Sequence, residues 1–96
     1  MSTRPRTNTA PAAPWHPALS PAAVLRHDPR RGAHLLILPE RVIVLHGHAT
    51  AVVALCDGTR TVETIVEELT DRFPRAPIAH DVPAFLDGLR REGCLR

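Results

Sequence analysis

Apolar residues in the first half of the chain fall in three short runs, at residues 24–28, 33–38 and 42–45. The last run is largely β-branched, and apolar runs of this length favour strands over helices. Residues 29–32 and 39–40 separate the runs, and the proline and glycine found there favour tight turns. The pattern therefore predicts three short antiparallel strands joined by two hairpin turns.

Beyond Gly47 the apolar residues recur at the spacing of an amphipathic helix. Asp57–Gly58 predicts the end of a first helix, and Thr61 is a favourable N-cap for a second, which runs to about Arg72. The three apolar stripes are Ala49, Val52, Val53 and Cys56; Val62, Ile65, Val66 and Leu69; and Ile78, Val82, Phe85, Leu86 and Leu89.

Pro83 sets the expected start of the third helix. Inside a helix, proline removes a hydrogen bond and clashes with the preceding turn, at a cost of about 3 kcal/mol. We therefore expect this helix to start near His80, with Pro83 in its first turn; a kinked helix with an earlier start is the alternative. Gly93 is expected to end it.

The 96 residues leave room for one small domain preceded by an arm. Residues 1–18 are rich in proline and poor in large apolar side chains, so we expect a flexible or polyproline-like arm there. Trp15 is the exception, and is expected to pack loosely over the core. Residues 19–96 are expected to form one α+β domain, a three-stranded antiparallel sheet packed on a three-helix winged-helix-turn-helix-like unit.

The composition, 44% apolar and 23% charged, is typical of a soluble globular protein. No apolar run approaches the roughly 18 residues of a membrane-spanning helix and no secretory signal is recognisable, so we expect a cytoplasmic protein. There Cys56 and Cys94 would stay reduced and buried. Arg4 and Arg6 account for the net charge of +2, because residues 24–96 hold ten arginines and ten acidic residues. A neutral domain does not indicate a nucleic-acid-binding face.

No residue cluster in the sequence indicates catalysis. His46 and His48 have metal-like spacing, but two imidazoles without a nearby carboxylate or thiolate make an incomplete zinc site, so we expect both to face solvent. Cys56 lies on an apolar stripe without a histidine at a recognisable motif spacing, and the hydrolase, phosphate-loop and dinucleotide motifs are missing. We therefore expect neither an enzyme nor a bound metal or cofactor.

The run at residues 42–45 is the strongest indication of binding. It is apolar on both faces of the predicted sheet, and its outer edge has no strand to pair with. A ligand peptide added as a further strand would pair with this edge, and the stripe of the third helix would take its side chains. A homodimer is a second way to cover the edge. The candidate peptide-binding residues are Val42, Ile43, Val44, Leu45, Val82, Phe85, Leu86 and Leu89, of which about half are expected to serve as core.

Four blocks of the sequence occur in an order and at a spacing that are found in a known family. They are residues 25–28 (LRHD), 36–42 (LILPERV), 55–62 (LCDGTRTV) and 81–86 (DVPAFL). Together they resemble the PqqD family of pyrroloquinoline quinone (PQQ) biosynthesis, over roughly residues 19–95. The third block has a local explanation as well, since Asp57 and Arg60 lie close enough to pair across the turn between two helices.

The resemblance implies a noncatalytic recognition element for ribosomally synthesized and post-translationally modified peptides (RiPPs). Such a protein would bind the precursor peptide PqqA and present it to the radical SAM enzyme PqqE, which crosslinks its Glu and Tyr side chains. Members hold the leader as an added strand against the third strand and third helix, which implies the same eight residues. A winged-helix DNA-binding regulator and a recognition element of another RiPP pathway are the alternatives.

Overall fold

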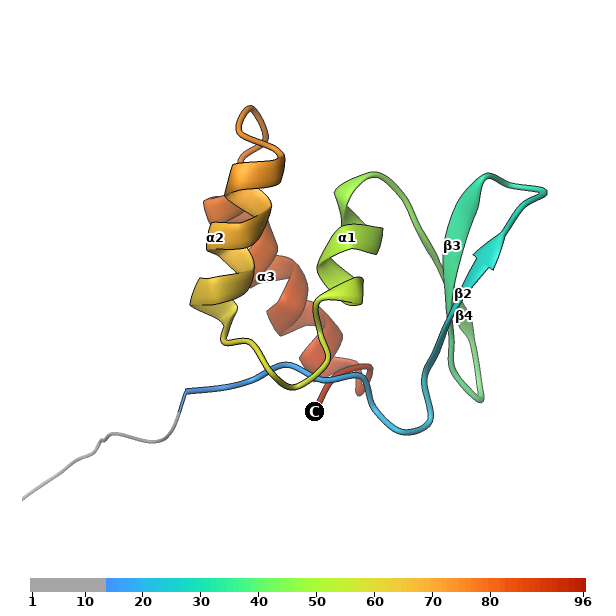
Figure 1. Ribbon diagram of the computed structural model, residues 1–96. Helices are drawn as coiled ribbons and strands as arrows, with labels where there is room; N and C mark the ends of the chain where they lie inside the picture. Colours follow the sequence, from blue (N-terminus) through green and yellow to red (C-terminus); the bar gives the residue numbers. More distant parts are fainter. Residues whose placement is uncertain (1–13) are drawn as a thin grey trace, which may run out of the picture.

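The computed structural model describes residues 14–96, so most of the predicted arm lies outside the described residues. Strand β2 (Val24–Asp28) pairs antiparallel with β3 (Ala33–Ile37), and β3 pairs antiparallel with β4 (Val42–Leu45). Helices α1 (His48–Ala54), α2 (Val62–Arg72) and α3 (Ile78–Arg91) follow, and lie to one side of the sheet (Figure 1). The predicted α+β class and the three-stranded antiparallel sheet are confirmed.

The register of the sheet confirms the predicted alternation of side chains. Leu36 pairs with Leu25 on one side and Ile43 on the other, so these three side chains share the face that packs on the helices. The opposite face carries Val24 and Val42, which are 51% and 54% exposed. Strand β4 is thus apolar on both faces, as predicted.

Helix α2 begins as its sequence predicts. The Thr61 hydroxyl accepts a hydrogen bond from the Thr64 N–H at 3.1 Å, and Glu63 lies in the first turn, where a negative charge is favoured. Ile65 and Leu69 are fully buried on the inner face. Helix α1 ends at Ala54, two residues earlier than the apolar stripe predicts.

The predicted start of α3 near His80 is wrong. The helix starts at Ile78, because the Pro77 carbonyl accepts hydrogen bonds from both the His80 and Asp81 N–H groups and so closes the first turn. Pro83 therefore lies inside the helix, and the early start buries Ile78. The predicted end is confirmed: Gly93, at φ +81°, follows the last turn and lets the Cys94 N–H reach the Leu89 carbonyl at 2.9 Å.

Residues 15–20 pack across the base of the helices (Figure 1). Pro17 is fully buried, Ala18 exchanges two backbone hydrogen bonds with Arg96, and the Leu19 N–H donates to the Cys56 carbonyl. The packed part of the chain therefore begins before Leu19, the residue at which the domain was expected to start.

Both cysteines are free and buried, as predicted. Burial, followed by the nearby charge of Asp57, raises the pKa of the Cys56 thiol to about 11. Its Sγ–H donates to the Val52 carbonyl of the preceding turn, so the side chain serves as part of the apolar core. Across residues 14–96, no helix has the length and apolarity needed to cross a membrane.

Candidate functional site

The outer edge of β4 carries main-chain groups that no other strand uses. The Leu38 N–H donates to the Arg41 carbonyl at 2.8 Å, so these two residues form a hydrogen-bonded pair. Antiparallel pairs alternate, which makes Leu36–Ile43 the next hydrogen-bonded pair and turns the N–H and C=O groups of Val42 and Val44 outward. Within residues 14–96, no strand pairs with that side of β4.

The N-terminal end of β4 is held beside the C-terminal end of α3 by Arg41. The Arg41 guanidinium donates from Nη2 to the Glu92 carbonyl at 2.8 Å and also lies 3.3 Å from the Glu92 carboxylate. A hydrogen bond to the Cys94 sulfur and the charge of Glu92 raise the pKa of Arg41, which stays protonated. The start of the edge strand is thereby held beside the end of α3.

The other end of β4 leads to an apolar cleft. The chain leaves Leu45 and enters α1 at His48, whose ring packs on Phe73 with the ring centroids 4.3 Å apart. Beside it a cleft of about 230 Å³ lies between α1 and α3. Its lining is apolar except for His48 and Asp81, and consists of His48, Ala49, Val52, Ala76, Pro77, Ile78, Asp81, Val82 and Phe85.

The structure divides the eight predicted site residues into two groups. Phe85 is half-buried and lines the cleft, Ile43 and Val44 are half-buried, and Val42 is exposed on the outer face of the sheet. The remaining four have exposed fractions of 5% or less and belong to the core: Leu45, Val82, Leu86 and Leu89. Val82 also contributes to the cleft wall.

Two polar residues of the cleft, His48 and Asp81, were not among the predicted site residues. The sequence offers one weak signal for each. His48 is the first residue of the helical pattern after Gly47, and Asp81 lies four residues before Phe85, on the same face of α3. The Asp81 carboxylate lies 2.9 Å from the His80 ring, and the Asp81 side chain is largely exposed to solvent. His46 and His48 are both exposed, as predicted.

Comparisons with known proteins identify the family. A model of the family described as coenzyme PQQ synthesis protein D (PqqD) matches residues 33–95. The chain belongs to the PqqD family. The Pseudomonas entomophila PqqA binding protein is 35% identical over 79% of this chain and 85% of that protein. The Rhodopseudomonas palustris PqqA binding protein is 38% identical over 82% of this chain and 79% of that protein.

A solved structure agrees with this fold. It is the solution NMR structure of the PqqD truncation of Methylobacterium extorquens PqqCD, described as a functional, stand-alone RiPP recognition element. It is 34% identical and superposes with a TM-score of 0.65, covering 83% of this chain and 87% of that one. The resemblance to the PqqD family drawn from four sequence blocks is confirmed.

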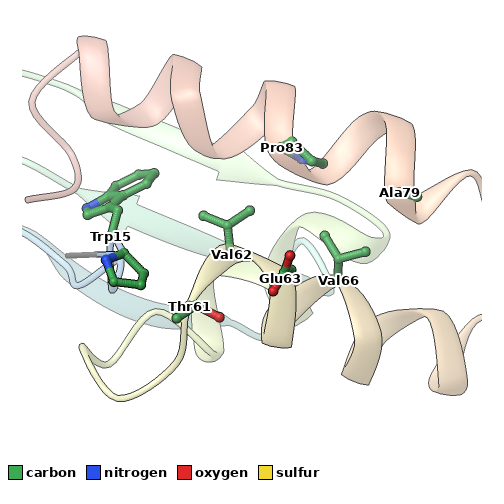
Figure 2. A pocket seen from close by; sticks show the side chains of 8 residues that line it. Trp15, Thr61, Val62, Glu63, Val66, Ala79 and Pro83 are labelled. Atoms are coloured by element: carbon green, nitrogen blue, oxygen red, sulfur yellow. The ribbon is translucent and has the colours of Figure 1, made fainter. Parts of the chain in front are cut away.

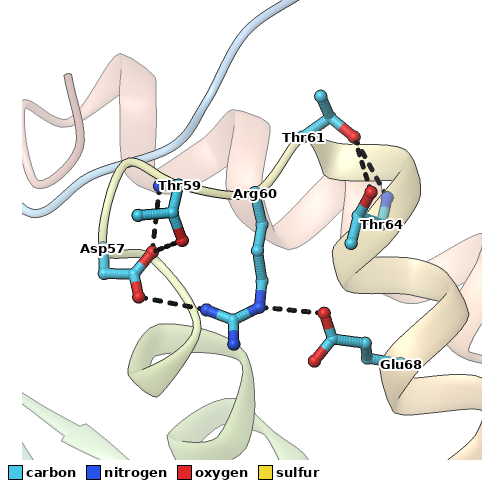
Figure 3. Close-up of polar contacts among 6 residues, drawn as sticks. All are labelled: Asp57, Thr59, Arg60, Thr61, Thr64 and Glu68. Atoms are coloured by element: carbon cyan, nitrogen blue, oxygen red, sulfur yellow. Dashed lines mark hydrogen bonds and ion pairs between the residues drawn. The ribbon is translucent and has the colours of Figure 1, made fainter.

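In this PqqD family member the LCDGTRTV block forms a polar corner between α1 and α2 (Figure 3). Arg60 donates to Asp57 at 3.0 Å, as predicted, and from Nε to Glu68 at 2.9 Å. The Thr59 hydroxyl and N–H both donate to Asp57. These hydrogen bonds, and then the charge of Arg60, hold the pKa of Asp57 below its ordinary value.

Asp57→Asn is expected to remove a pH-dependent contribution to stability. Because the Asp57 pKa is lower in the folded than in the unfolded chain, the carboxylate stabilises the fold above the unfolded pKa of about 3.9. That contribution is lost as the pH falls through the folded value. Thermal unfolding from pH 7 to pH 3 should therefore show a lower Tm for the variant at neutral pH, and Tm curves that converge in acid.

The matched control is Asp87→Asn. It also removes one carboxylate, here from an exposed ion pair between Asp87 and Arg91 on successive turns of α3, and it leaves the corner intact. Its Tm should follow that of the unmodified protein across the pH range. Parallel curves for Asp57→Asn, offset equally at pH 7 and pH 3, would contradict the role assigned to the Asp57 carboxylate.

Proposed function

We propose that this chain is a noncatalytic peptide-binding protein that acts in the cytoplasm in PQQ biosynthesis. It binds the precursor peptide PqqA as a fourth strand on the outer edge of β4. The observation that carries this proposal is the unpaired edge at Val42 and Val44, on a strand that leads directly to His48 and the apolar cleft between α1 and α3. The names of the similar Pseudomonas and Rhodopseudomonas proteins support PqqA as the ligand.

The main chain supplies most of the affinity in this mode of binding. Val42 and Val44 offer two N–H donors and two C=O acceptors, each contributing about 1 kcal/mol when paired. Side chains on one face of the added strand meet Phe85 and the cleft, which lets apolar residues at alternate peptide positions be buried. Specificity therefore rests on the cleft, while the edge of β4 accepts any extended segment.

Presentation to the radical SAM enzyme PqqE completes the proposal. A peptide held by its leader on β4 leaves its remaining residues free for an enzyme to act on. The chain itself contributes no reacting group in this scheme, since the cleft is lined by aliphatic and aromatic side chains with His48 and Asp81 at its rim. Held in this way, the peptide reaches a higher local concentration at the enzyme.

An amide NMR titration of the isotope-labelled full chain with synthetic PqqA tests the binding step. We expect saturable shift changes concentrated at residues 41–45 and 78–86. Shift changes confined to α2, or an unchanged spectrum at high peptide excess, would contradict strand addition at β4. Size-exclusion chromatography of PqqE mixed with the peptide-loaded chain tests presentation, and separate elution of the two proteins would contradict it.

A further inference from the structure

The cleft between α1 and α3 continues into a second hollow at the connection between α2 and α3. Residues 73–77 form this connection, and a hollow of about 510 Å³ lies against it. We call it the loop hollow. It shares three lining residues with the α1–α3 cleft, which are His48, Ala76 and Pro77, and its other lining residues are Phe73, Pro74 and Arg75. The cleft and the loop hollow therefore form one continuous surface.

Another cleft, between α2 and α3, is separate from this surface (Figure 2). Its volume is about 560 Å³, and Val62 and Val66 of α2 line it together with Ala79 and Pro83 of α3. It shares no lining residue with the α1–α3 cleft or with the loop hollow. Of these two spaces, the loop hollow is the one that a peptide bound in the α1–α3 cleft reaches along a continuous surface.

The direction of β4 brings an added strand toward the loop hollow. One end of β4 lies beside the C-terminal end of α3, and the other leads to His48, which lines both the α1–α3 cleft and the loop hollow. From Phe85 back to the first residue of α3, the helix rises about 10 Å. About three residues of an extended peptide cover this distance. A peptide that continues past its paired segment therefore reaches the loop hollow within a few residues.

The loop hollow carries positive charge beside an aromatic wall. Arg75 lines it, and the Arg72 guanidinium lies 5.2 Å from the centre of the Phe73 ring. Both arginines are exposed, and within residues 14–96 neither forms an ion pair. Asp71 and Asp81, the acidic residues nearest to the connection in the sequence, do not line the hollow. The two positive charges are therefore available to a bound group.

A carboxylate is the group of a bound peptide that this arrangement would hold. Guanidinium groups bind carboxylates through charge and through parallel hydrogen bonds. The ionised carboxylates of a peptide are those of its Glu and Asp side chains and of its C-terminus. The Phe73 ring and the prolines of the hollow also offer apolar contact to the methylene groups of a glutamate. A peptide that extends past the α1–α3 cleft thus meets a site suited to an acidic side chain.

We propose that the loop hollow is a subsite for an acidic side chain of the bound peptide, with Arg72 and Arg75 binding its carboxylate. The glutamate or aspartate lies outside the segment that pairs with β4. This inference rests on the proposed function, and it adds selection by charge to a binding mode that otherwise depends on main-chain and apolar contacts. Because both arginines are exposed, the two contacts together should change the affinity about fivefold.

A double-mutant cycle measured by isothermal titration calorimetry tests the subsite. One change is Arg72→Gln with Arg75→Gln in the full-length chain, and the other replaces every Glu and Asp of synthetic PqqA by Gln and Asn. The protein variant should bind PqqA about fivefold more weakly than the unmodified chain. It should bind the neutralised peptide as the unmodified chain does. Arg72→Lys with Arg75→Lys keeps both charges and should retain most of the affinity for PqqA.

Arg26→Gln with Arg30→Gln is the matched control. These arginines are also exposed and form no ion pair within the described part of the chain. They belong to β2, the strand at the edge opposite to β4, and to the turn that follows it. The control removes the same net charge and should bind PqqA like the unmodified chain. Raising the salt concentration to about 0.5 M should remove the difference between the unmodified chain and the Arg72 and Arg75 variant.

The cycle separates failure of the subsite from failure of the proposed function. Equal weakening in the control would show that net charge, and not the loop hollow, governs affinity. An equal loss with both peptides would show that Arg72 and Arg75 act through the fold. Unchanged affinity in their variant, with the shift changes at residues 41–45 retained, would overturn the subsite alone. Absence of PqqA binding to the unmodified chain would overturn the proposed function and the subsite with it.

Discussion

Val44→Pro should weaken the binding of PqqA at least about tenfold while the domain stays folded. The Val44 N–H points away from β3, so proline removes a donor to the added strand without removing one from the sheet. The proline ring also projects from the edge into the path of the incoming main chain. Together these effects exceed the roughly 1.4 kcal/mol that corresponds to a tenfold change in affinity.

The opposite edge of the sheet offers a matched control. By the same alternation, the His27 N–H of β2 points away from β3, at the edge of the sheet opposite to β4. His27→Pro therefore makes the same chemical change in the same sheet and should leave PqqA affinity unchanged. Isothermal titration calorimetry measures both affinities, and circular dichroism confirms that both variants fold. Equal loss of affinity at the two edges, or none at Val44, would contradict binding on β4.

Ile43→Pro should weaken the fold itself, unlike Val44→Pro. Ile43 forms a hydrogen-bonded pair with Leu36, so proline here removes a bond of the sheet itself. The same edge strand thus contains positions that report on folding and positions that report on binding. The sequence alone does not separate them, because the hydrogen-bonding phase follows from the Leu38–Arg41 pair at the turn.

Much of the fold can be predicted from local patterns in this chain. The three strands follow from short apolar runs between turn residues, and α2 follows from its stripe together with the Thr61 N-cap. The start of α3 cannot be predicted in this way. The local cost of Pro83 favours a later start, whereas the observed start comes with two hydrogen bonds to the Pro77 carbonyl and with the burial of Ile78 to 3% exposure, which depends on tertiary packing.

The candidate site is predictable only in part, because part of it follows from local patterns and part depends on tertiary packing. Alternation along residues 42–45 indicates an edge strand with two apolar faces, and the stripe of α3 indicates an apolar wall. Periodicity does not say which member of a stripe lies under its neighbours, so Leu86 and Phe85 look equivalent in the sequence. The contribution of His48 also requires knowing that α1 packs beside α3.

Leu86→Ala should therefore act mainly on stability and Phe85→Ala mainly on peptide binding, although the two residues are adjacent. Leu86 is fully buried, and its truncation should lower the free energy of unfolding by about 2–5 kcal/mol. In a domain of this size each kcal/mol shifts Tm by about 4–8 °C, so the Tm should fall by at least about 8 °C. Phe85 is half-buried in the cleft wall, and its truncation should cost less stability and weaken PqqA binding about tenfold.

Thermal unfolding and calorimetric titration of both variants, well below their Tm, separate the two roles. Leu86→Ala should bind PqqA with nearly unchanged affinity once folded, since Leu86 is fully buried and does not line the cleft where we propose that the peptide binds. Should that variant fail to fold, Leu86→Val provides a milder truncation at about 1 kcal/mol. A larger loss of affinity at Leu86 than at Phe85 would show that the peptide enters the core, and that strand addition opens the domain between β4 and α3.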